Sequence, residues 1–448
     1  MNGTIRNTDQ KVGKAFGDRW DMAFRSKKKP KLLLVSLHDP YMDSDRVMPP
    51  LGIMSLHAYM LACDVNSTIE NDFDMTDLSK YENYTHIGIS CMTPQKKQAY
   101  EILQAVKCCY PEIVIIIGGS HAKFYYEDCS TQPFDHIVIG DGEYALQSIL
   151  DEHVVTPRTI EIPISEEDMN KLPLPYRESS FLNQYEFDVQ GHRATTILTA
   201  KGCPMSCGFC EHANTKVKLY SAENVGRQID EAKAVGYDSI MFFDDIFCLS
   251  KKRVVELGLE ILKRAMPYRC FAHAKTMTNE IAYVLSDTGC IEVGFGAESG
   301  SQKILDNINK KTTVEQNEEL VRVCNERGIK VKAFLMLGLP GESKETVKDT
   351  TKFLRFLMSN KFYNHKKELS SNDFDLGIYF PYKGTPIRDS IDRSENIYDL
   401  FLECNPDKLQ GVYKGKNGIA EAVVRTSSLT SEEIVYLKNS LYTRFKGL

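Results

Sequence analysis

The sequence lacks the features that mark several large classes of protein. It has one tryptophan, and no apolar run approaches the ~20 residues that a membrane-spanning helix requires. Its first thirty residues are polar and contain no apolar core of signal-peptide length. The net charge of -6 creates no long-range attraction to nucleic acid or to an anionic membrane. We therefore expect no nucleic-acid partner and no membrane association.

The cysteines lack the even, regular spacing of a disulfide framework. There are 13 in 448 residues, an odd number scattered over a large chain. Such thiols are typical of a reducing compartment, so the sequence predicts a cytoplasmic protein. Most of the cysteines are interpreted as small core residues. The exception is KGCPMSCGFCEH (201–212), which holds three of them close together.

The first half of the chain alternates between short apolar runs and helical patterns. Residues 1–30 look like a loose extension, and their basic run 25–29 is interpreted as a solvated linker. Strands are expected at 31–37, 86–90, 113–119 and 136–140, with helices such as 52–62 and 95–107 between them. This alternation predicts a doubly wound, Rossmann-like α/β domain over 31–150, with its ligand edge at the carboxyl ends of the strands.

The second half shows a further alternation after an irregular linker at 151–190. Strands are expected at 195–200, 239–245, 269–275, 292–299, 330–338 and 374–380. Six such units predict a partial TIM-type barrel, (β/α)6, over 191–386, with functional residues at strand C-terminal ends. Thr313 and Gln316 predict a capping box, and Ser221 is expected to start another helix. The polar stretch 362–373 is interpreted as a loop, and 387–448 as a mostly helical C-terminal segment.

Three cysteines follow the first of these barrel strands directly. Cys203, Cys207 and Cys210 have the spacing C-x3-C-x2-C, and the glycines at 202 and 208 allow a tight turn around them. Thiolates hold iron–sulfur clusters, and three ligands on a four-iron cube leave one iron open for substrate chemistry. Two other interpretations stay open: a zinc site completed by His212, and a structural turn that holds cysteines by chance.

This loop after a barrel strand resembles the radical S-adenosylmethionine (radical SAM) superfamily. The resemblance implies a [4Fe-4S] cluster whose open iron is chelated by the amino and carboxylate groups of S-adenosylmethionine (SAM). The reduced cluster then cleaves SAM to methionine and a 5′-deoxyadenosyl radical. A reductant such as flavodoxin or ferredoxin is implied as a partner.

The resemblance also assigns residues to SAM binding, by their place in the motifs FFDD, GFGAESGS and LMLGLPGE. The implied contacts are the adenine for Phe209, the ammonium for Asp244 and Asp245, the ribose and carboxylate for Glu298 and Ser299, and the base for Gly338, Leu339 and Pro340. His273 and Lys275 end the third barrel strand and are interpreted either as substrate-positioning residues or as structural ones. Glu342 is either part of this site or an ordinary first-turn helix acid.

Residues 31–150 resemble the cobalamin-binding domain that precedes the barrel in one radical SAM class. The motifs MPPLGIMSLHAYM, IGISCMTPQ, IIIGGSHA and FDHIVIGDGEYAL carry this resemblance. Gly118 and Gly119 permit close backbone approach to the cofactor. His121 follows them on an expected loop, either contacting the cofactor or solvated.

One motif of cobalamin domains is altered in this chain. Domains that ligate cobalt through histidine carry D-x-H-x-x-G, whereas SLHDPY has His38 in place but Ser36 for the aspartate and Tyr41 for the glycine. Without the acid, a histidine ligand loses its usual support. His38 is therefore either a cobalt ligand or a loop residue. A domain that kept its packing and lost its cofactor also stays open.

Together, the resemblances imply a radical SAM enzyme that uses methylcobalamin to methylate an unactivated carbon, or phosphorus, of a small molecule or peptide. The alternative enzyme performs a cyclisation or rearrangement without methyl transfer. A non-enzymatic sensor or electron carrier is disfavoured, because an electron carrier normally saturates all cluster ligands.

Overall fold

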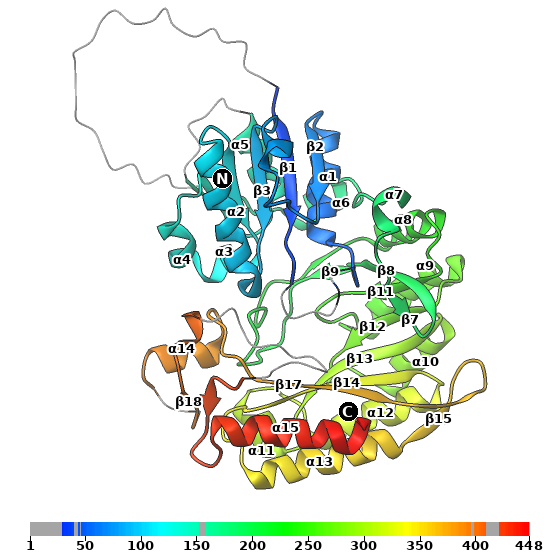
Figure 1. Ribbon diagram of the computed structural model, residues 1–448. Helices are drawn as coiled ribbons and strands as arrows, with labels where there is room; N and C mark the ends of the chain where they lie inside the picture. The colour runs from blue at the N-terminus through cyan, green and yellow to red at the C-terminus, as the bar shows by residue number, and fades with distance from the viewer. Residues whose placement is uncertain are drawn as a thin grey trace, which may run out of the picture.

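The computed structural model describes residues 29–39, 44, 46–151, 158–395, 398–408 and 421–447. Most of the expected N-terminal extension, with the basic run 25–28, lies outside these residues, as does Tyr41. Figure 1 shows two α/β bodies, one formed by the blue and cyan segments and the other by the green to orange segments. Each body is built around its own parallel sheet.

The N-terminal sheet has six parallel strands in the order β2-β1-β3-β4-β5-β6. The strands are β1 (Lys31–Ser36), β2 (Asn66–Glu70), β3 (His86–Ser90), β4 (Val114–Gly118), β5 (His136–Val138) and β6 (Thr159–Ile160). The four expected strands are confirmed. The two unpredicted strands lie at the edges of the sheet, where one short strand, NSTIE, is mostly polar.

Helices cover both faces of this sheet. Leu32 and Leu34 pack with α1 (Leu51–Ala62) and α5 (Glu143–Leu150), whereas Leu33 and Val35 pack with α2 (Lys96–Cys109). This alternation follows from the two-residue period of a strand. The doubly wound domain is therefore confirmed. The strand order reverses between β1 and β3, which is the usual ligand position in such a sheet.

The second sheet has the order β17-β14-β13-β12-β11-β8-β7. Its strands are β7 (Asp188–Val189), β8 (His192–Ile197), β11 (Ser239–Phe242), β12 (Tyr268–Ala272), β13 (Cys290–Glu298), β14 (Lys330–Leu337) and β17 (Asp373–Ile378). The short strand β7 is antiparallel to β8, and the other six strands are parallel. The sheet curls into a half-barrel, so the expected (β/α)6 partial barrel is confirmed (Figure 1).

The two faces of this sheet differ in burial. In β14, Val331, Ala333, Leu335 and Leu337 are buried in the core formed with the helices, whereas the side chains between them are half-buried. The helices of this half of the chain are α8 (Ala222–Ala234), α9 (Lys251–Arg264), α10 (Asn279–Asp287), α11 (Gln302–Asn307), α12 (Val314–Glu326), α13 (Lys344–Ser359) and α14 (Pro386–Asp392). The inner face is therefore the accessible one.

Local sequence signals predict the helix ends correctly and one loop incorrectly. Thr313 and Gln316 form the expected capping box of α12, and the Ser221 hydroxyl caps α8. The stretch 362–373 was expected to be a loop, which is wrong: β15 (Lys361–Tyr363) and β16 (Leu369–Ser371) form an antiparallel hairpin, and β17 begins at Asp373. The hairpin is held by backbone hydrogen bonds between two mostly polar segments. Its side chains therefore show no apolar periodicity from which the strands could be predicted.

The connecting and C-terminal segments are only partly irregular. The expected linker 151–190 contains α6 (Glu166–Lys171) and α7 (Ser179–Leu182). The C-terminal segment adds the short hairpin β18 (Phe401–Leu402) with β19 (Val424–Arg425), and the long helix α15 (Ser431–Lys446). The Tyr442 hydroxyl of α15 accepts a hydrogen bond from the backbone N–H of Leu376 in β17, so this helix covers the end strand of the half-barrel.

An ion-pair cluster joins the two bodies. Asp141, which follows β5, pairs with Lys201 of β9 (Ala200–Lys201) at 3.0 Å and with Lys218 of β10 (Lys218–Leu219) at 3.1 Å. Strands β9 and β10 are antiparallel partners, and the cysteine loop runs between them. We call Asp141, Lys201 and Lys218 the Asp141 bridge, because it fixes both strands flanking that loop to the N-terminal sheet.

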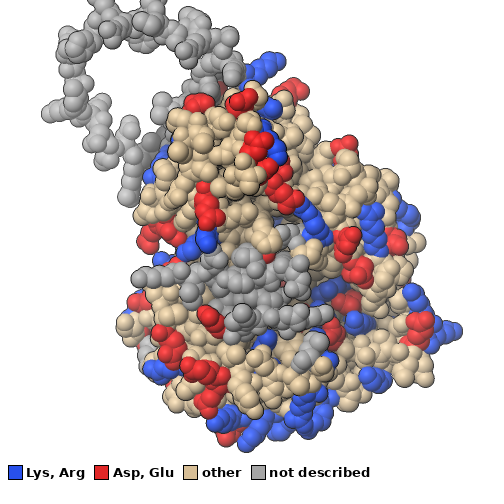
Figure 2. Space-filling view, viewed as in Figure 1, with Lys and Arg blue, Asp and Glu red and all other residues tan. Residues whose placement is uncertain are grey.

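No helix within the described ranges is long and apolar enough to cross a membrane. Lys and Arg side chains are interspersed with Asp and Glu side chains over the face shown in Figure 2. This mixture matches the modest net charge of -6.

Removing the charge of Asp141 should destabilise the joint between the two bodies. Burial alone would raise the pKa of Asp141, but the two lysines outweigh it and lower that pKa. We expect Asp141→Asn to lower the free energy of unfolding near neutral pH by about 2 kcal/mol, because two partly buried ammonium groups lose their partner. The wild-type advantage should disappear as the pH falls through the lowered pKa of Asp141.

Chemical denaturation at several pH values checks this expectation. Asp230→Asn is the matched control, because Asp230 pairs with Arg264 at 2.8 Å while 57% of its side chain is exposed. The control should cost less than about 1 kcal/mol. Equal losses in both variants would show that the Asp141 bridge contributes no more than an exposed pair.

Candidate active site

The cysteine loop follows β8 and is held at several points by backbone contacts. Gly202 has φ +95°, and a Cβ there would lie 2.5 Å from the Lys216 carbonyl oxygen, so only glycine fits this turn. The Cys203 N–H donates to Thr215 Oγ1 at 2.8 Å, and the Thr215 N–H donates to the Cys203 carbonyl at 2.9 Å. The expected tight turn is therefore present at Gly202.

The three thiols lie in a protected environment. Cys203 and Cys207 are buried and Cys210 is half-buried. Burial raises the pKa of each thiol, to about 11 for Cys210, and each thiol also raises the pKa of another through charge repulsion. Lys310 acts in the opposite direction on the pKa values of Cys203 and Cys207. Three thiols within mutual repulsion range and a nearby cation fit an anionic cluster, whose ligands must be thiolates.

The zinc alternative depended on His212 as a fourth ligand. The His212 ring instead contacts Asp245, with Nδ1 2.7 Å from Oδ1, and this contact raises the pKa of His212. No three His, Cys, Asp or Glu side chains in the described part of the chain are placed to hold one metal ion. A cluster differs from a single ion in that each thiolate binds its own iron.

Both aspartates of FFDD hold the cysteine loop. Asp244 is buried and accepts hydrogen bonds from the N–H groups of Thr199, at 2.6 Å, and Ala200, at 3.2 Å, and from the Thr199 hydroxyl. Burial raises the pKa of Asp244 to about 6 in spite of these bonds. Asp245 contacts His212 at the far end of the loop. The structure thus gives both residues loop-positioning contacts, which the SAM interpretation did not include.

A buried ion pair lies beside the loop. Lys310 Nζ is 2.8 Å from Glu298 Oε1, both residues are buried, and the ammonium lies 5.5 Å from the centre of the Phe209 ring. Burial opposes the charge of Lys310, but Glu298 and the thiols of Cys207 and Cys210 outweigh it, so the pKa of Lys310 is raised. Glu298 has φ +58°, an uncommon conformation for a non-glycine residue that is concentrated at functional sites.

The segment that carries Lys310 also supports the loop directly. The Ile308 carbonyl accepts from the Gly208 N–H at 2.8 Å, and Asn309 Nδ2 donates to the Ser206 carbonyl at 2.7 Å. These contacts fix Lys310 relative to the cysteines. Sequence reasoning missed Lys310, because it lies in a polar connection, NINKKTT, that carries no periodic signal.

The other predicted SAM residues differ in how they are placed. Ser299 is buried, and its hydroxyl contacts Thr350 Oγ1 at 3.1 Å, so it ties β13 to α13. Leu339 is fully buried in the same apolar cluster that Phe209 packs against. Gly338 has φ +80°, which permits the turn after β14, and the Pro340 carbonyl accepts from Asn307 Nδ2 at 2.9 Å. Leu339 and Phe209 are thus brought together, whereas Ser299 points into the protein.

Two buried groups at this edge have unused hydrogen-bonding capacity. His273 Nε2 and Glu342 Oε2 have no hydrogen-bond partner among the described residues. Burial, assisted by Lys310 and Lys275, lowers the pKa of His273 to about 3, so its ring is neutral. Lys275 itself is exposed. Burial raises the pKa of Glu342 to about 7, although the Thr346 hydroxyl donates to its Oε1 at 2.6 Å.

The N-terminal sheet contributes a pocket at its carboxyl edge. A cavity of about 200 Å³ lies between the strand ends and the helices α1 and α5. Gly118 and Gly119 line it, together with Gly88, Gly140 and Gly142. Lys201 and Asp141 of the Asp141 bridge also line it. Strand ends that lack side chains give a large cofactor direct access to the backbone, so the pocket fits a cobalamin group.

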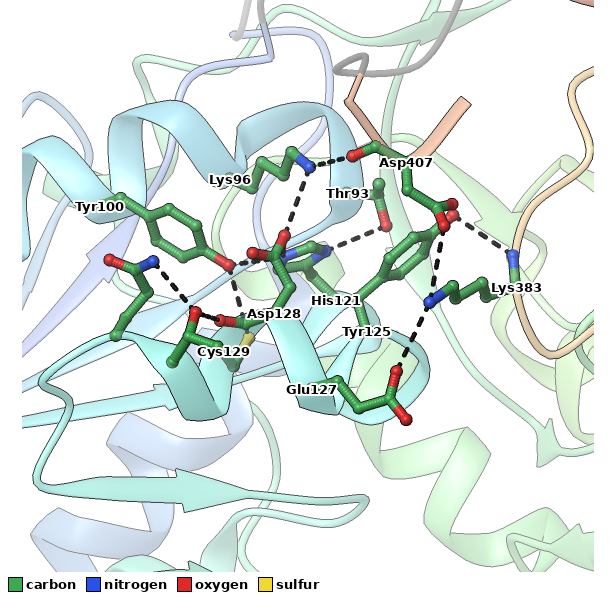
Figure 3. Close-up of polar contacts among 12 residues, drawn as sticks. Thr93, Lys96, Tyr100, His121, Tyr125, Glu127, Asp128, Cys129, Lys383 and Asp407 are labelled. Atoms are coloured by element: carbon green, nitrogen blue, oxygen red, sulfur yellow. Dashed lines mark hydrogen bonds and ion pairs between the residues drawn. The ribbon is translucent and has the colours of Figure 1, made fainter. Parts of the chain in front are cut away.

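His121 does not line that pocket, and the expected loop is wrong. The residue lies in the short helix α3 (Ser120–Phe124) and is completely buried. Its ring nitrogens contact the Tyr100 hydroxyl at 3.0 Å and Thr93 Oγ1 at 3.4 Å (Figure 3). Burial lowers the pKa of His121 to about 4. His121 is therefore a neutral structural residue.

The surroundings of His121 connect the N-terminal body to the C-terminal segment. Lys96 Nζ contacts Asp128 at 3.3 Å and donates to the Asp407 carbonyl at 2.6 Å (Figure 3). Arg388 makes two bonds to the Asp407 carboxylate, at 2.9 and 2.8 Å. Ile387, the residue before Arg388 in α14, donates its N–H to the carbonyl of Gly208 in the cysteine loop at 2.9 Å. Helix α14 therefore covers the cysteine loop and is anchored to the N-terminal body.

His38 lies at the pocket edge of the sheet, after β1. It is exposed, and its backbone N–H donates to Gln98 Oε1 at 2.9 Å. It is not among the residues that line the pocket at this edge. Its role as a cobalt ligand stays a prediction.

Sequence comparison locates both sites within known families. The pattern of the B12 binding domain matches residues 43–150, and that of the radical SAM superfamily matches residues 197–354, which include the cysteine loop. The chain is a member of the radical SAM superfamily with an N-terminal B12-binding domain. Radical SAM proteins carry a [4Fe-4S] cluster and SAM, and the B12-binding domain carries cobalamin, so the expected cofactors are confirmed.

Relatives of this radical SAM protein cover most of its length. An uncharacterized methyltransferase from Pyrococcus horikoshii is 24% identical over 430 residues, 89% of this chain and 87% of the relative. An anaerobic magnesium-protoporphyrin IX monomethyl ester cyclase from Rubrivivax gelatinosus is 25% identical, over 68% of this chain and 62% of the relative. The solved structure of the radical S-adenosylmethionine methyltransferase TsrM from Kitasatospora setae has a TM-score of 0.70 over 93% of this chain and 89% of its own, at 16% identity.

The radical SAM protein should show a pH-dependent stability that traces to Glu342. Its folded pKa of about 7 lies above the ordinary value of 4.5, so the folded state binds the proton more tightly and stability is lost as the pH rises through 7. Glu342→Gln cannot ionise. Between pH 4.5 and pH 8, the free energy of unfolding of the variant should therefore rise by roughly 2–3 kcal/mol relative to that of the wild type.

Denaturation curves at pH 5 and pH 8 measure this difference. Glu345→Gln, an exposed acid in the first turn of α13, is the matched control and should follow the wild type at both pH values. A wild-type stability that tracks Glu342→Gln over the whole range would show that Glu342 titrates normally.

Proposed function

We propose that this protein is a cobalamin-dependent radical SAM methyltransferase that methylates an unactivated carbon, or phosphorus, of a small molecule or peptide. One observation carries the proposal. Lys201 lines the pocket of the B12-binding domain and lies two residues before Cys203 of the cysteine loop. A single short strand, β9, therefore adjoins both cofactor sites. Methyl transfer from cobalamin to a carbon radical requires that arrangement.

The chain's residues bind and orient the cofactors. When bound, the cluster with SAM supplies a 5′-deoxyadenosyl radical and cobalamin supplies the methyl group. Cys203, Cys207 and Cys210 would hold the cluster. In place of the contact implied by the resemblance, the ribose or carboxylate, Glu298 would accept from the ammonium of SAM. Lys310 would pair with the SAM carboxylate, so opposite charges would lie against both ends of the amino acid.

We further propose that residues 31–150 hold cobalamin, that 191–386 hold the cluster and SAM, and that Phe209, Leu339 and Pro340 pack against adenine. The clustering of Leu339 with the Phe209 ring supports this placement. A flavodoxin or ferredoxin would supply electrons. All thirteen cysteines are free, which supports a reducing, cytoplasmic location.

The decisive experiment follows the products of SAM. Anaerobic protein reconstituted with iron, sulfide and cobalamin is incubated with a reductant, a cell extract of small molecules and SAM carrying a deuterated methyl group. Methyl transfer should yield S-adenosylhomocysteine and 5′-deoxyadenosine together, with the label in a product. If 5′-deoxyadenosine forms without S-adenosylhomocysteine or labelled product, the cyclase or rearrangement alternative is correct instead.

Changing any one cluster cysteine should remove the cluster. We expect Cys203→Ala, Cys207→Ala and Cys210→Ala each to lose most of the bound iron and the visible absorption of the anaerobic protein, because three thiolates are the minimum set here. Cys404→Ala, a change at an exposed cysteine, is the matched control and should retain both. Full iron content in the loop variants would exclude the assignment.

Lys310 should contribute to SAM affinity. We expect Lys310→Met to raise the Kd of SAM by roughly ten- to a hundredfold, the loss typical of one charge-assisted hydrogen bond. Equilibrium dialysis with the reconstituted protein measures Kd, and iron content confirms that the cluster is intact. Lys311→Met changes the adjacent, exposed lysine and should leave Kd unchanged. Unaltered SAM affinity in Lys310→Met would limit Lys310 to supporting the loop.

A further inference from the structure

Three phenylalanines form a continuous surface on the inner face of the half-barrel. Phe243 follows β11, Phe271 lies in β12 and Phe334 lies in β14. The ring centres are 5.9 Å apart between Phe243 and Phe271, and 6.0 Å apart between Phe271 and Phe334. We call these three residues the aromatic shelf.

Glycines in β13 allow the shelf to form. Gly294 is the strand neighbour of Phe271, and Gly296 is the strand neighbour of Phe334. A Cβ at Gly294 would lie 2.8 Å from the Phe271 ring and 3.2 Å from the Phe334 ring. The two rings therefore meet across β13 only because that strand has no side chain between them.

The shelf is accessible, unlike Phe242, Phe295 and Phe374, the other phenylalanines of the barrel strands. Phe243 is 46% exposed, whereas its neighbour Phe242 is completely buried against the outer helices. Phe271 and Phe334 are half-buried. The rings thus occupy the half-open inner face and are not needed to fill the core.

The shelf lies one side-chain layer below the cofactor edge. His273 lies two residues beyond Phe271, directly after β12. Glu298, which pairs with Lys310, lies two residues beyond Gly296 in β13. The residues proposed to contact adenine follow the end of β14, further along the strand than Phe334. The shelf is therefore distinct from the proposed adenine position.

Two ion pairs lie in the layer beneath the shelf. The Arg269 guanidinium lies 5.4 Å from the Phe271 ring centre and 3.2 Å from Glu292. Lys332 Nζ lies 5.9 Å from the Phe334 ring centre and 2.9 Å from Asp375. Because cations already lie against both rings, the shelf disfavours a positively charged ligand group. It favours a neutral ring that can add edge-to-face or offset contacts.

We propose that the aromatic shelf binds a flat, conjugated ring of the substrate. This inference rests on the proposed function and names its substrate class: compounds with an uncharged aromatic or otherwise conjugated ring. The ring would lie on Phe271 and Phe334, with Phe243 at its edge. It would present its reacting atom to the layer that contains Glu298, Lys310 and the cysteine loop.

The test compares two neutral probes of matched skeleton, 2-naphthol and its saturated form decahydro-2-naphthol. Each is titrated into the anaerobic holoenzyme, which carries its cluster, cobalamin and saturating SAM, and binding is followed by saturation-transfer NMR. We expect 2-naphthol to bind about tenfold more tightly, because contacts between aromatic rings add to the burial of area. The double variant Phe271→Leu/Phe334→Leu should reduce this preference to about twofold or less.

Two further variants make the test specific. Phe356→Leu is the matched control, since Phe356 is a half-buried ring of α13 with Phe353 at 6.4 Å and Arg322 at 5.6 Å, but on the outside of the barrel. It should keep the full preference. Phe243→Leu changes an exposed ring, so it tests the shelf even if the double variant does not fold.

Three results would overturn the proposal. These are equal binding of both probes to the wild type, a preference that survives in the double variant and in Phe243→Leu, or binding of 2-naphthol that is seen only when SAM is left out, which would make the shelf the adenine site. The measurement needs no turnover. Failure of the shelf therefore differs from failure of methyl transfer, which is read from S-adenosylhomocysteine and the deuterated product.

Discussion

The arrangement of the whole molecule depends on one carboxylate between two lysines. Asp141 belongs to the B12-binding domain, and Lys201 and Lys218 belong to the two strands on either side of the cluster loop. A partly buried carboxylate needs compensating charge, and the two described lysines that pair with Asp141 belong to the other domain. The same contact that satisfies Asp141 therefore determines where the cysteines lie relative to the cobalamin pocket. Helix α14 adds a second connection, from Asp407 to Gly208.

The two faces of the half-barrel strands have different roles: one face forms the core with the helices, and the other is available to bind ligands. Alternate residues of β14 fill the core with the helices, and the residues between them remain accessible on the inner face. Inner residues are therefore free to differ in chemistry from layer to layer: ion pairs at the bottom, the aromatic shelf above them, and the Glu298–Lys310 pair at the cofactor edge. A change of substrate needs a change in the inner layers only. The outer core, on which folding depends, stays the same.

Much of this could be predicted from the sequence, because the relevant signals are local. Buried parallel strands are continuous apolar runs, helix starts carry caps such as Thr313, and the cysteine spacing is compressed into one loop. The missed features are pairings between distant segments. Lys310 and Asp141 look like ordinary surface charges until the fold places Glu298 and Lys201 beside them. His121 was misplaced for the same reason, since its partners Tyr100 and Thr93 come from a different helix and turn.

The charged side chains at the site fit the binding of an anionic cluster and of SAM. Burial raises the pKa of all three thiols, to about 11 for Cys210, and the buried Lys310 pairs with Glu298 at 2.8 Å. Cys203, Cys207 and Cys210 would hold iron as thiolates, so iron binding would release their protons and add negative charge beside Lys310. These thiolates would add anionic partners for the Lys310 ammonium and so offset part of the free-energy cost of burying its charge. A buried cation near a protonated loop is hard to explain by packing, whereas an anionic cluster with an amino-acid ligand accounts for both Lys310 and Glu298.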